Sequence, residues 1–351
     1  NLILKKVSTF IDSGEYVLGS QVKEFEEKFN NFLDNQGYFV SCANGTDAIT
    51  LALLANEISS GFVITPSHTA PASILGIINA GCKPLFVDID AKTALISIDE
   101  IEKKLKSNSK IKAILAVHLY GNGIDIPSLV KIARSHKCLV IEDCAQSAGT
   151  RIFNKYAGTL ANAGTFSFFP TKNLAALGDG GGVWVPNKKL KNRIESLRQY
   201  GWNKDRLVKV ANGMNSRLDE LQAVVLQIRL KDLKKDILNR RKIAKAYDLN
   251  LSPYFERLSY PDYQFCSFHL YVVKVKHRKK LMRFMQQNDI YLGIHYTPPN
   301  HSNGLLQKFS ANLPITDKIS KEVVSLPIHP ELHSSVQAKI IKILNKFEDT
   351  L

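Results

Sequence analysis

The sequence predicts an α/β protein with a mostly parallel central sheet, and three observations support this class. Seven short apolar runs follow one another between about residue 38 and residue 186. Several of them are apolar throughout rather than alternating, which is typical of strands buried on both faces. Helical stretches, with apolar residues three and four positions apart, separate several of the runs. Alternating strands and helices predict a layered domain with right-handed crossovers.

The seven expected strands are mostly rich in β-branched or aromatic residues. They are YFVSC (38–42), FVIT (62–65), PLFVDI (84–89), AILAVHLY (113–120), CLVIED (138–143), GTFSFF (164–169) and GGVWV (181–185). The clearest helices between them are DAITLALLA (47–55) and PSLVKIARSHK (127–137).

The pattern changes after residue 215. Residues 216–247 form one long amphipathic helical pattern without Pro or Gly, which we expect to lead out of the first domain. A strand (269–275) and two helices (279–288 and 335–348) follow. We therefore predict a large α/β domain over residues 1–245 and a smaller α+β domain over residues 246–351.

Composition excludes several classes of protein. The 351 residues are 44% hydrophobic and 23% charged, which excludes a disordered chain, collagen and a coiled coil. The net charge of +15 is compatible with an anionic partner without choosing one. Five widely spaced cysteines without a CxxC pair argue against a disulfide framework or a metal site and favour a reducing, cytoplasmic location. The sequence also shows neither a membrane span nor a signal pattern, although it begins at Asn1 rather than Met.

Ligands of open α/β sheets bind at the carboxyl ends of the strands, so the residues after each apolar run are candidates for a site. The first run leads into CANGTDA (42–48), where Asn44, Gly45 and Thr46 lie between a strand and a helix. Free N–H groups at the start of that helix would bind an anion. The alternative is an ordinary strand–helix turn that Thr46 caps.

The fifth run ends in LVIEDCAQ (139–146), which places Glu142 and Asp143 after an apolar stretch. One of these carboxylates is expected at the mouth of the sheet, where it needs a positive partner. Gln146 would face the same crevice. The alternative is an aspartate that caps the next helix.

The sixth run leads into FSFFPTKNLAALGDGGGVWV (166–185), which contains Lys172 and four glycines. A lysine among apolar residues can be desolvated, which lowers its pKa and makes its amine a nucleophile. The glycines allow a ligand to approach the backbone closely. A solvated loop lysine is the alternative, and the phosphate-loop patterns GxxxxGK[ST] and GxGxxG are absent.

An anion site, a carboxylate and a buried amine at strand ends match the three partners that pyridoxal phosphate needs. The cofactor has a phosphate, a basic ring nitrogen and an aldehyde. Lysine forms a Schiff base with the aldehyde, and a carboxylate keeps the ring nitrogen protonated.

These residues also carry a resemblance to a known family. The chain resembles the sugar aminotransferases of the DegT/DnrJ/EryC1/StrS family, which have the aspartate aminotransferase fold. The similar segments cover almost the whole chain, and SFFPTKN and NSRLDELQA are the most specific of them. The others are SGEYVLGSQVKEFEEKF (13–29), CANGTDA, VITPSHT…AGCKPLFVDID (63–90), HLYGN (118–122), IEDCAQ, LRQYGW (197–202) and HYTPPNH (295–301).

The resemblance implies a role for each matching position. Lys172 would form the Schiff base and move the proton between substrate and cofactor, which alternates between pyridoxal and pyridoxamine phosphate. Asp143 would pair with the ring nitrogen. Gln146 would contact the ring hydroxyl side, and Gly45, Thr46 and Ser167 would bind the phosphate. Asn215 would reach the phosphate in the neighbouring subunit, because these enzymes form homodimers with shared sites. His295 and Tyr296 would lie near the sugar nucleotide.

The sequence departs from the family pattern around the cofactor ring. Many relatives have an aromatic residue that stacks on the ring where this chain has Ala70. His68 could take that role, or it could be a structural histidine. The usual tyrosine before PTKN is Phe169, and Ala148 stands where relatives can carry a bulkier side chain. We expect these changes to affect substrate choice rather than reaction type.

The resemblance also implies a substrate and a donor. One branch of the family replaces the lysine with histidine and performs dehydration, and Lys172 places this chain with the aminotransferases. The HYTPPNH segment, together with LRQYGW and NSRLDELQA, resembles the enzymes that act on 3-keto-6-deoxy sugars linked to a nucleotide. This resemblance implies dTDP as the nucleotide and L-glutamate as the donor. Amination at C4 is the alternative. A nucleic-acid-binding regulator is the rival from another class, but the Lys and Arg residues are spread over helix faces, so we expect neither nucleic acid nor membrane as a partner.

Overall fold

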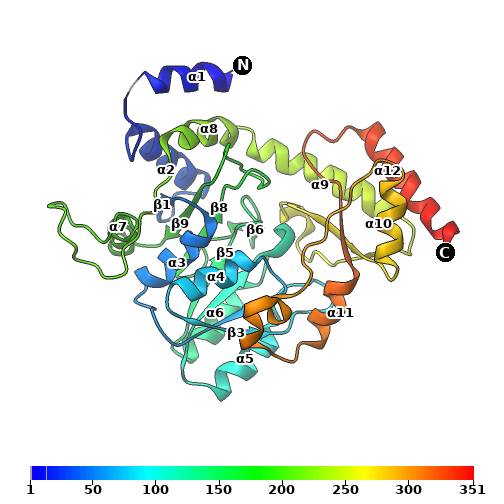
Figure 1. Cartoon of the computed structure of the whole chain (residues 1–351), viewed down its shortest axis with the longest axis horizontal. Coiled ribbons are helices and arrows are strands. Elements are labelled where there is room, and N and C mark those ends of the chain that lie inside the picture. Colours follow the sequence, from blue (N-terminus) through cyan, green and yellow to red (C-terminus); the bar gives the residue numbers. More distant parts are fainter. Residues whose placement is uncertain (1, 13) are drawn as a thin grey trace.

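A seven-stranded sheet forms the centre of the protein in a computed structural model that describes residues 2–12 and 14–351 (Figure 1). The strand order is β1-β9-β8-β5-β4-β2-β3. The four pairs from β8 to β3 are parallel, and β9 is antiparallel to both β1 and β8. The predicted mostly parallel sheet is therefore confirmed. Its strands are Tyr38–Cys42 (β1), Phe62–Pro66 (β2), Lys83–Val87 (β3), Ile111–Val117 (β4), Leu139–Asp143 (β5), Ala163–Ser167 (β8) and Gly181–Val185 (β9).

Three strands end earlier than predicted. Strand β3 stops at Val87 rather than at residue 89. Strand β4 stops at Val117 rather than at residue 120, because the chain turns into a short 3₁₀ helix in which Tyr120 has a φ of 63°. A left-handed residue cannot continue a strand. Strand β8 stops at Ser167, and the N–H of Phe168 donates to the carbonyl of Gly180 across the loop that follows.

Helices cover both faces of the sheet, and the strands are buried on both faces as predicted. Along β4, Ile114 and Ala116 face one apolar cluster, while Ala113 and Leu115 face the other. This alternation follows from the two-residue period of a strand. The first cluster also contains residues from α2, α5, α6 and α8 (Glu220–Leu230), and the second contains residues from α3 and α7. The helices are Leu2–Ile11 (α1), Ser20–Phe32 (α2), Gly45–Ala55 (α3), Pro71–Asn79 (α4), Ile98–Ser107 (α5), Ile126–Ser135 (α6) and Lys188–Leu197 (α7).

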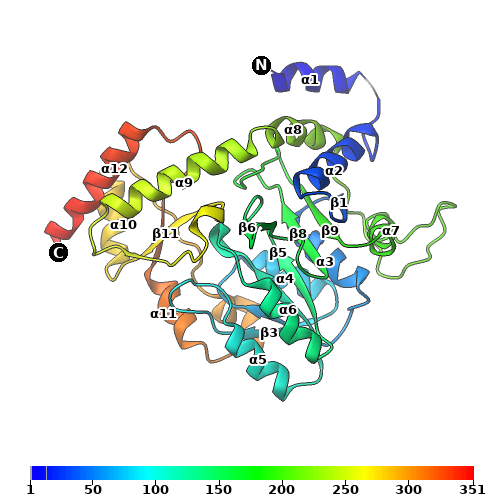
Figure 2. The ribbon, with the colours of Figure 1, turned by 180° about the vertical axis from the view of Figure 1, so that it is seen from behind.

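The single long helix predicted for residues 216–247 is wrong. The structure has two helices, α8 (Glu220–Leu230) and α9 (Leu233–Asn250), separated by Lys231 and Asp232. Both separating residues have helix-like backbone angles, so the chain bends without a Pro or Gly. Helix α8 is buried over most of its surface against α2, and α9 leads away toward the C-terminal part (Figure 2).

The C-terminal part has its own antiparallel sheet, β10-β11-β12. A third apolar cluster gathers side chains from α9, β11, β12, α10 and α12. Helix α9 spans both parts, because Leu233 and Ile237 belong to the first cluster while Tyr247 belongs to the third. The division at residues 245 and 246 therefore stays a prediction. The remaining elements are Arg151–Ile152 (β6), Lys155–Tyr156 (β7), Glu256–Arg257 (β10), Tyr271–Lys274 (β11), Arg278–Gln286 (α10), Pro314–Glu322 (α11), Val323–Leu326 (β12) and Ser334–Phe347 (α12).

Two further observations concern the chain as a whole. Within residues 2–12 and 14–351, none of the helices has the length and apolar character needed to cross a membrane. The five cysteines are free and buried. Their burial explains why the sequence contains cysteine without any pairing pattern, since a buried thiol packs as a small apolar group.

Candidate active site

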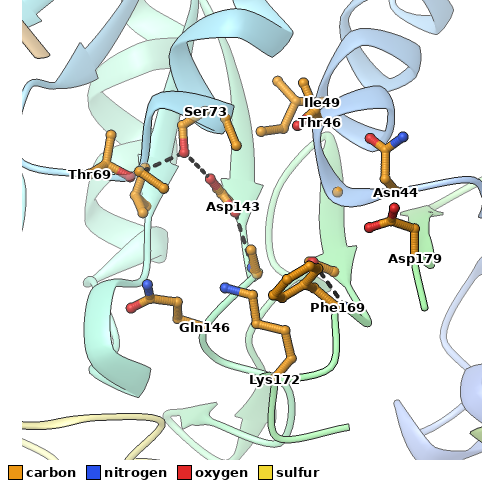
Figure 3. Close-up of a pocket in the computed structure, with 16 residues that line it drawn as sticks. Asn44, Thr46, Ile49, Thr69, Ser73, Asp143, Gln146, Phe169, Lys172 and Asp179 are labelled. Carbon is orange, nitrogen blue, oxygen red and sulfur yellow. Dashed lines mark hydrogen bonds between the residues drawn. The ribbon is translucent and has the colours of Figure 1, made fainter. Parts of the chain in front are cut away.

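A cavity of about 230 Å³ opens where the strands of the large sheet end (Figure 3). It lies at the carboxyl ends of β1, β5 and β8, which is the place predicted for a ligand of an open sheet. Six of the predicted site residues line it, and they come from four separate segments of the chain: Gly45, Thr46, Asp143, Gln146, Ser167 and Lys172.

The start of helix α3 forms one end of the cavity. The side chain of Asn44 accepts the N–H of Asp47 at 2.8 Å, so Asn44 caps the helix rather than Thr46. The N–H groups of Gly45 and Thr46 have no acceptor among the described residues, as expected for the first turn of a helix. Together with the helix dipole, these two donors form an anion-binding end.

Ser167 closes this end from the neighbouring strand. It is the last residue of β8, and a Cβ at Gly45 would lie only 2.7 Å from the Cβ of Ser167. Glycine is therefore required for the close approach of α3 to β8. The contact brings the serine hydroxyl beside the free N–H groups of α3.

The carboxylate at the mouth of the sheet is Asp143, and Glu142 points the other way. Successive side chains of a strand face opposite sides, and these two residues are the last two of β5. Glu142 is buried and accepts hydrogen bonds from His118 Nε2 at 3.0 Å and from the N–H groups of Gly158 and Leu160 at 2.8 Å. Glu142 therefore holds loops together, and Asp143 is the acid that lines the cavity.

Lys172 is largely buried in the loop between β8 and β9 and points into the cavity. Burial lowers the pKa of its amine from the ordinary range, and the Asp143 carboxylate offsets part of that change. The loop is fixed from α8, where Arg229 donates to the carbonyl of Ala175 at 2.7 Å. Asn173 also donates to the carbonyl of Ser267 at 3.2 Å. A fixed, desolvated amine is suited to act as a nucleophile and a base.

Gln146 connects the cavity to the HYTPPNH segment. Its side-chain N–H donates to the hydroxyl of Tyr296 at 2.8 Å, and burial with the nearby Asp143 raises the pKa of Tyr296 to about 12. His295 Nδ1 lies 2.8 Å from the hydroxyl of Ser325. Burial and then Lys172 lower the pKa of His295. Both predicted sugar-side residues thus lie beside the cavity rather than in its wall.

Asn215 lies outside this cavity. It is exposed and lines a neighbouring hollow together with Arg217 and Asp219. Asp179 borders both the hollow and the cavity. The structure of one chain therefore does not bring Asn215 together with the other predicted phosphate contacts.

Small residues form the wall of the cavity that contains Ala70. Thr69 and Ala70 line the cavity, whereas His68 is fully buried behind it. His68 Nε2 lies 2.8 Å from the hydroxyl of Tyr120, and burial lowers the pKa of His68 to about 4. Of the two readings of His68, the structure supports the structural histidine. Phe169 lines the cavity and is 47% exposed.

Several polar residues that line the cavity are not among the predicted cofactor contacts. The sequence placed Asn44 at this turn but not as the cap, although an asparagine directly before a helix is a common cap. Asp179 lies within the glycine run and carried no further signal. Ser73 contacts Asp143, which is 70 residues away, and no local pattern indicates such a contact.

Comparison with known proteins identifies the group to which the chain belongs. The family model described as DegT/DnrJ/EryC1/StrS aminotransferase family matches residues 1–345. The chain belongs to this aminotransferase family. The resemblance drawn from the motifs is thereby confirmed, and the protein is a sugar aminotransferase that depends on pyridoxal phosphate.

Two curated relatives of this aminotransferase carry different kinds of name. The dTDP-3-amino-3,6-dideoxy-α-D-galactopyranose transaminase of Aneurinibacillus thermoaerophilus is 38% identical over 348 residues, which is 98% of this chain and 95% of the relative. The pleiotropic regulatory protein of Geobacillus stearothermophilus is 34% identical and aligns with 98% of this chain and 94% of its own length.

Solved structures share the fold of this aminotransferase. DesV from S. venezuelae, in complex with a ketimine intermediate, has a TM-score of 0.95 and 30% identity, covering 99% of this chain and 95% of DesV. NtdA from Bacillus subtilis, with the bound cofactor PMP, has a TM-score of 0.89 and 28% identity, covering 97% of this chain and 80% of NtdA. The predicted fold class is confirmed.

The residues of the cavity fit pyridoxal phosphate. The two N–H groups of Gly45 and Thr46 without a described acceptor suit a phosphate, and the buried carboxylate of Asp143 suits a protonated ring nitrogen. Lys172 is the only lysine or arginine among the described residues that line the cavity. Its amine therefore suits the aldehyde.

Proposed function

We propose that this aminotransferase moves an amino group from L-glutamate to the C3 keto group of a nucleotide-linked keto-6-deoxy sugar. The observation that carries the proposal is the meeting of Lys172, Asp143 and the anion-binding end of α3 in one cavity. Each of the three groups is supplied by a different strand end, so their convergence depends on the whole sheet.

The proposed cofactor contacts follow from the positions of donors and acceptors. The N–H groups of Gly45 and Thr46 and the hydroxyl of Ser167 hold the phosphate. Asp143 keeps a proton on the ring nitrogen, and Gln146 donates on the ring hydroxyl side. When bound, pyridoxal phosphate supplies an electrophilic carbon for amines and a ring that stabilises negative charge on the carbon next to the nitrogen.

The proposed role of Lys172 is to move one proton in each half of the reaction. Burial lowers its pKa and so favours the neutral amine, in which Nζ can accept the proton of the donor carbon that bears nitrogen and deliver it to the cofactor. In the second half Nζ takes that proton back and places it on C3 of the sugar. The carboxylate of Asp143 stabilises the charge that develops during both transfers.

The sugar side of the site is proposed at His295 and Tyr296. Both lie beside the cavity, and Tyr296 is bonded to Gln146. The relative that is 38% identical is named as a transaminase that forms a 3-amino sugar of dTDP, which supports C3 and dTDP. Amination at C4 of a 4-keto sugar is the alternative within the same chemistry.

A homodimer with shared sites is part of the proposal. Two apolar side chains of the Lys172 loop lie on the surface, Phe169 at 47% and Leu177 at 58% exposure. A second copy of the chain would cover them and would bring its Asn215 toward the phosphate end. This arrangement explains why Asn215 is exposed in one chain and outside its cavity.

The assay that tests the proposal uses the purified protein, pyridoxal phosphate, L-glutamate and a panel of dTDP-linked 3-keto and 4-keto-6-deoxy sugars. We expect 2-oxoglutarate and a 3-amino sugar, identified by mass and NMR. Amination of the 4-keto sugars alone would overturn C3, and no amination of any sugar would overturn the proposal.

A regulatory role is the second candidate because one relative is named a pleiotropic regulatory protein. Filter binding to random DNA at physiological salt separates the two functions. We expect the protein to bind DNA weakly, with an affinity that changes little with salt concentration. Tight binding with a steep salt dependence by protein that retains no cofactor would favour the regulator.

A further inference from the structure

The carboxylate of Asp143 is held by two protein donors from different segments. The hydroxyl of Ser73 donates to Oδ2 at 2.7 Å, and the N–H of Ala145 donates to Oδ1 at 3.0 Å (Figure 3). Asp143 and Ser73 are both almost fully buried. Each oxygen therefore has one lone pair in use, which fixes the plane of the carboxylate and leaves a lone pair for a ligand in the cavity.

The direction of the serine hydrogen bond can be assigned. A carboxylate only accepts, so the single proton of Ser73 points to Asp143. Thr69 Oγ1 lies 3.1 Å from Ser73 Oγ, and it must then donate to the serine oxygen. Donation by Thr69 polarises the serine hydroxyl and strengthens its bond to the carboxylate.

The two hydroxyl residues are themselves fixed. Ser73 is in the first turn of α4, where its N–H donates to the carbonyl of Ala70 at 3.1 Å. The carbonyl of Thr69 accepts from the side chain of Asn300 at 2.8 Å. Asn300 is 1% exposed and belongs to the C-terminal part of the chain. The relay from Thr69 through Ser73 to Asp143 is therefore held at both ends.

We infer that Ser73 is a positioning residue, which aims the carboxylate of Asp143 at the ring nitrogen of the cofactor. The inference rests on the proposed contact between Asp143 and that nitrogen. Ser73 adds specificity for a ring with nitrogen at this place, because a carboxylate free to rotate would lose the alignment that a charge-assisted hydrogen bond needs.

The test compares two ligands of the apoprotein. Pyridoxamine phosphate forms no Schiff base with Lys172, so its dissociation constant reports the non-covalent contacts alone. Its 1-deaza analogue has C–H in place of the ring nitrogen and otherwise keeps the same groups. The dissociation constant of the 1-deaza analogue divided by that of pyridoxamine phosphate measures the contribution of the nitrogen. We expect Ser73→Ala to reduce this ratio about tenfold, which is the size expected for a charge-assisted hydrogen bond.

Three further variants make the comparison decisive. Ser73→Thr keeps the hydroxyl and should restore the ratio. Ser320→Ala removes a buried hydroxyl of α11 whose partner is the carbonyl of Asp317, and it should leave the ratio unchanged. Asp143→Asn tests the proposed contact itself, and it should abolish the preference for the ring nitrogen.

The outcomes separate the two levels of the proposal. An equal loss of affinity for both ligands in Ser73→Ala, or no loss for either, would overturn the role of Ser73. A normal preference for the ring nitrogen in Asp143→Asn would instead overturn the proposed contact of Asp143, whatever the serine variants do.

Discussion

The side-chain oxygen of Gln146 accepts a hydrogen bond from the backbone N–H of Tyr120 at 2.7 Å. Because a backbone N–H can only donate, this contact fixes which end of the amide is oxygen. The amide nitrogen then donates one proton to the hydroxyl of Tyr296. Its second proton has no acceptor among the described residues, and Gln146 lines the cavity. Gln146 is therefore set up as a donor toward the bound cofactor.

Gln146→Glu should weaken the binding of pyridoxamine phosphate by about tenfold, since a carboxylate cannot donate and repels an anionic ring oxygen. The measurement is a titration of the apoprotein followed by fluorescence or calorimetry. Gln337→Glu is the matched control, because Gln337 is also buried and its amide donates to the carbonyl of Ile243 in α9. If both variants lose affinity equally, the donor role of Gln146 is wrong.

Gly45→Ala should lower stability by about 1–3 kcal/mol, because its Cβ would lie 2.7 Å from the Cβ of Ser167. Either α3 or β8 has to move, so affinity for the phosphate-bearing cofactor should also fall. Thermal melting and cofactor titration measure the two effects. Gly178→Ala is the milder control, since its Cβ would meet only the end of the Gln222 side chain at 3.1 Å. An unchanged melting temperature and affinity in Gly45→Ala would contradict the close contact.

Lys172→Met should stabilise the apoprotein at neutral pH by roughly 1 kcal/mol while abolishing activity. The lysine pKa is lower in the folded state than in the unfolded chain, so the unfolded chain binds more protons in the interval between the two values. The lysine therefore destabilises the fold below the folded pKa, and this penalty disappears as the pH rises toward the usual lysine range. Urea unfolding of the wild-type and Lys172→Met apoproteins should show that the difference in their free energies of unfolding becomes smaller as the pH rises through the alkaline range. A less stable Lys172→Met at neutral pH would contradict the assigned desolvation.

His68 should make the protein lose stability on acidification. Burial lowers its pKa from 6.5 to about 4, so the unfolded chain binds more protons between these values. The free energy of unfolding therefore falls as the pH decreases from 6.5 to 4, and the total decrease is about 3 kcal/mol once the pH is below both values. His68→Gln should flatten this part of the stability curve, whereas His329→Gln, at an exposed position, should not. Parallel curves for the wild type and His68→Gln would show that another group is responsible.

Much of the fold followed from local patterns in the sequence. The runs around Val40, Ile114 and Val183 are apolar on both faces, and they form strands that separate two apolar clusters. The break between α8 and α9 could not be predicted, because Lys231 and Asp232 carry no helix-breaking side chain. Helix α8 packs in the first apolar cluster and α9 continues from that cluster into the third, so the packing of both helices depends on residues far away in the sequence.

The site also contains residues that the local sequence indicated and residues that it did not. Lys172, Asp143 and Gly45 each follow an apolar run, so the position of a strand end indicated them. The relay from Thr69 and Ser73, and the amide orientation of Gln146, depend on partners far away in the sequence. Such contacts are set by how the strands are ordered in the sheet, which the local sequence does not specify.

The measurement that tests the central claim most directly is the site of covalent attachment of the cofactor. The holoenzyme is reduced with borohydride, digested, and mapped by mass spectrometry. We predict a phosphopyridoxyl group on Lys172 alone, no labelled peptide in Lys172→Ala, and a loss of turnover of about 10³-fold or more in that variant. Lys103→Ala, on an exposed helix face, is the control and should keep both the label and the turnover. A label on another lysine, or turnover at the wild-type level in Lys172→Ala, would contradict the account.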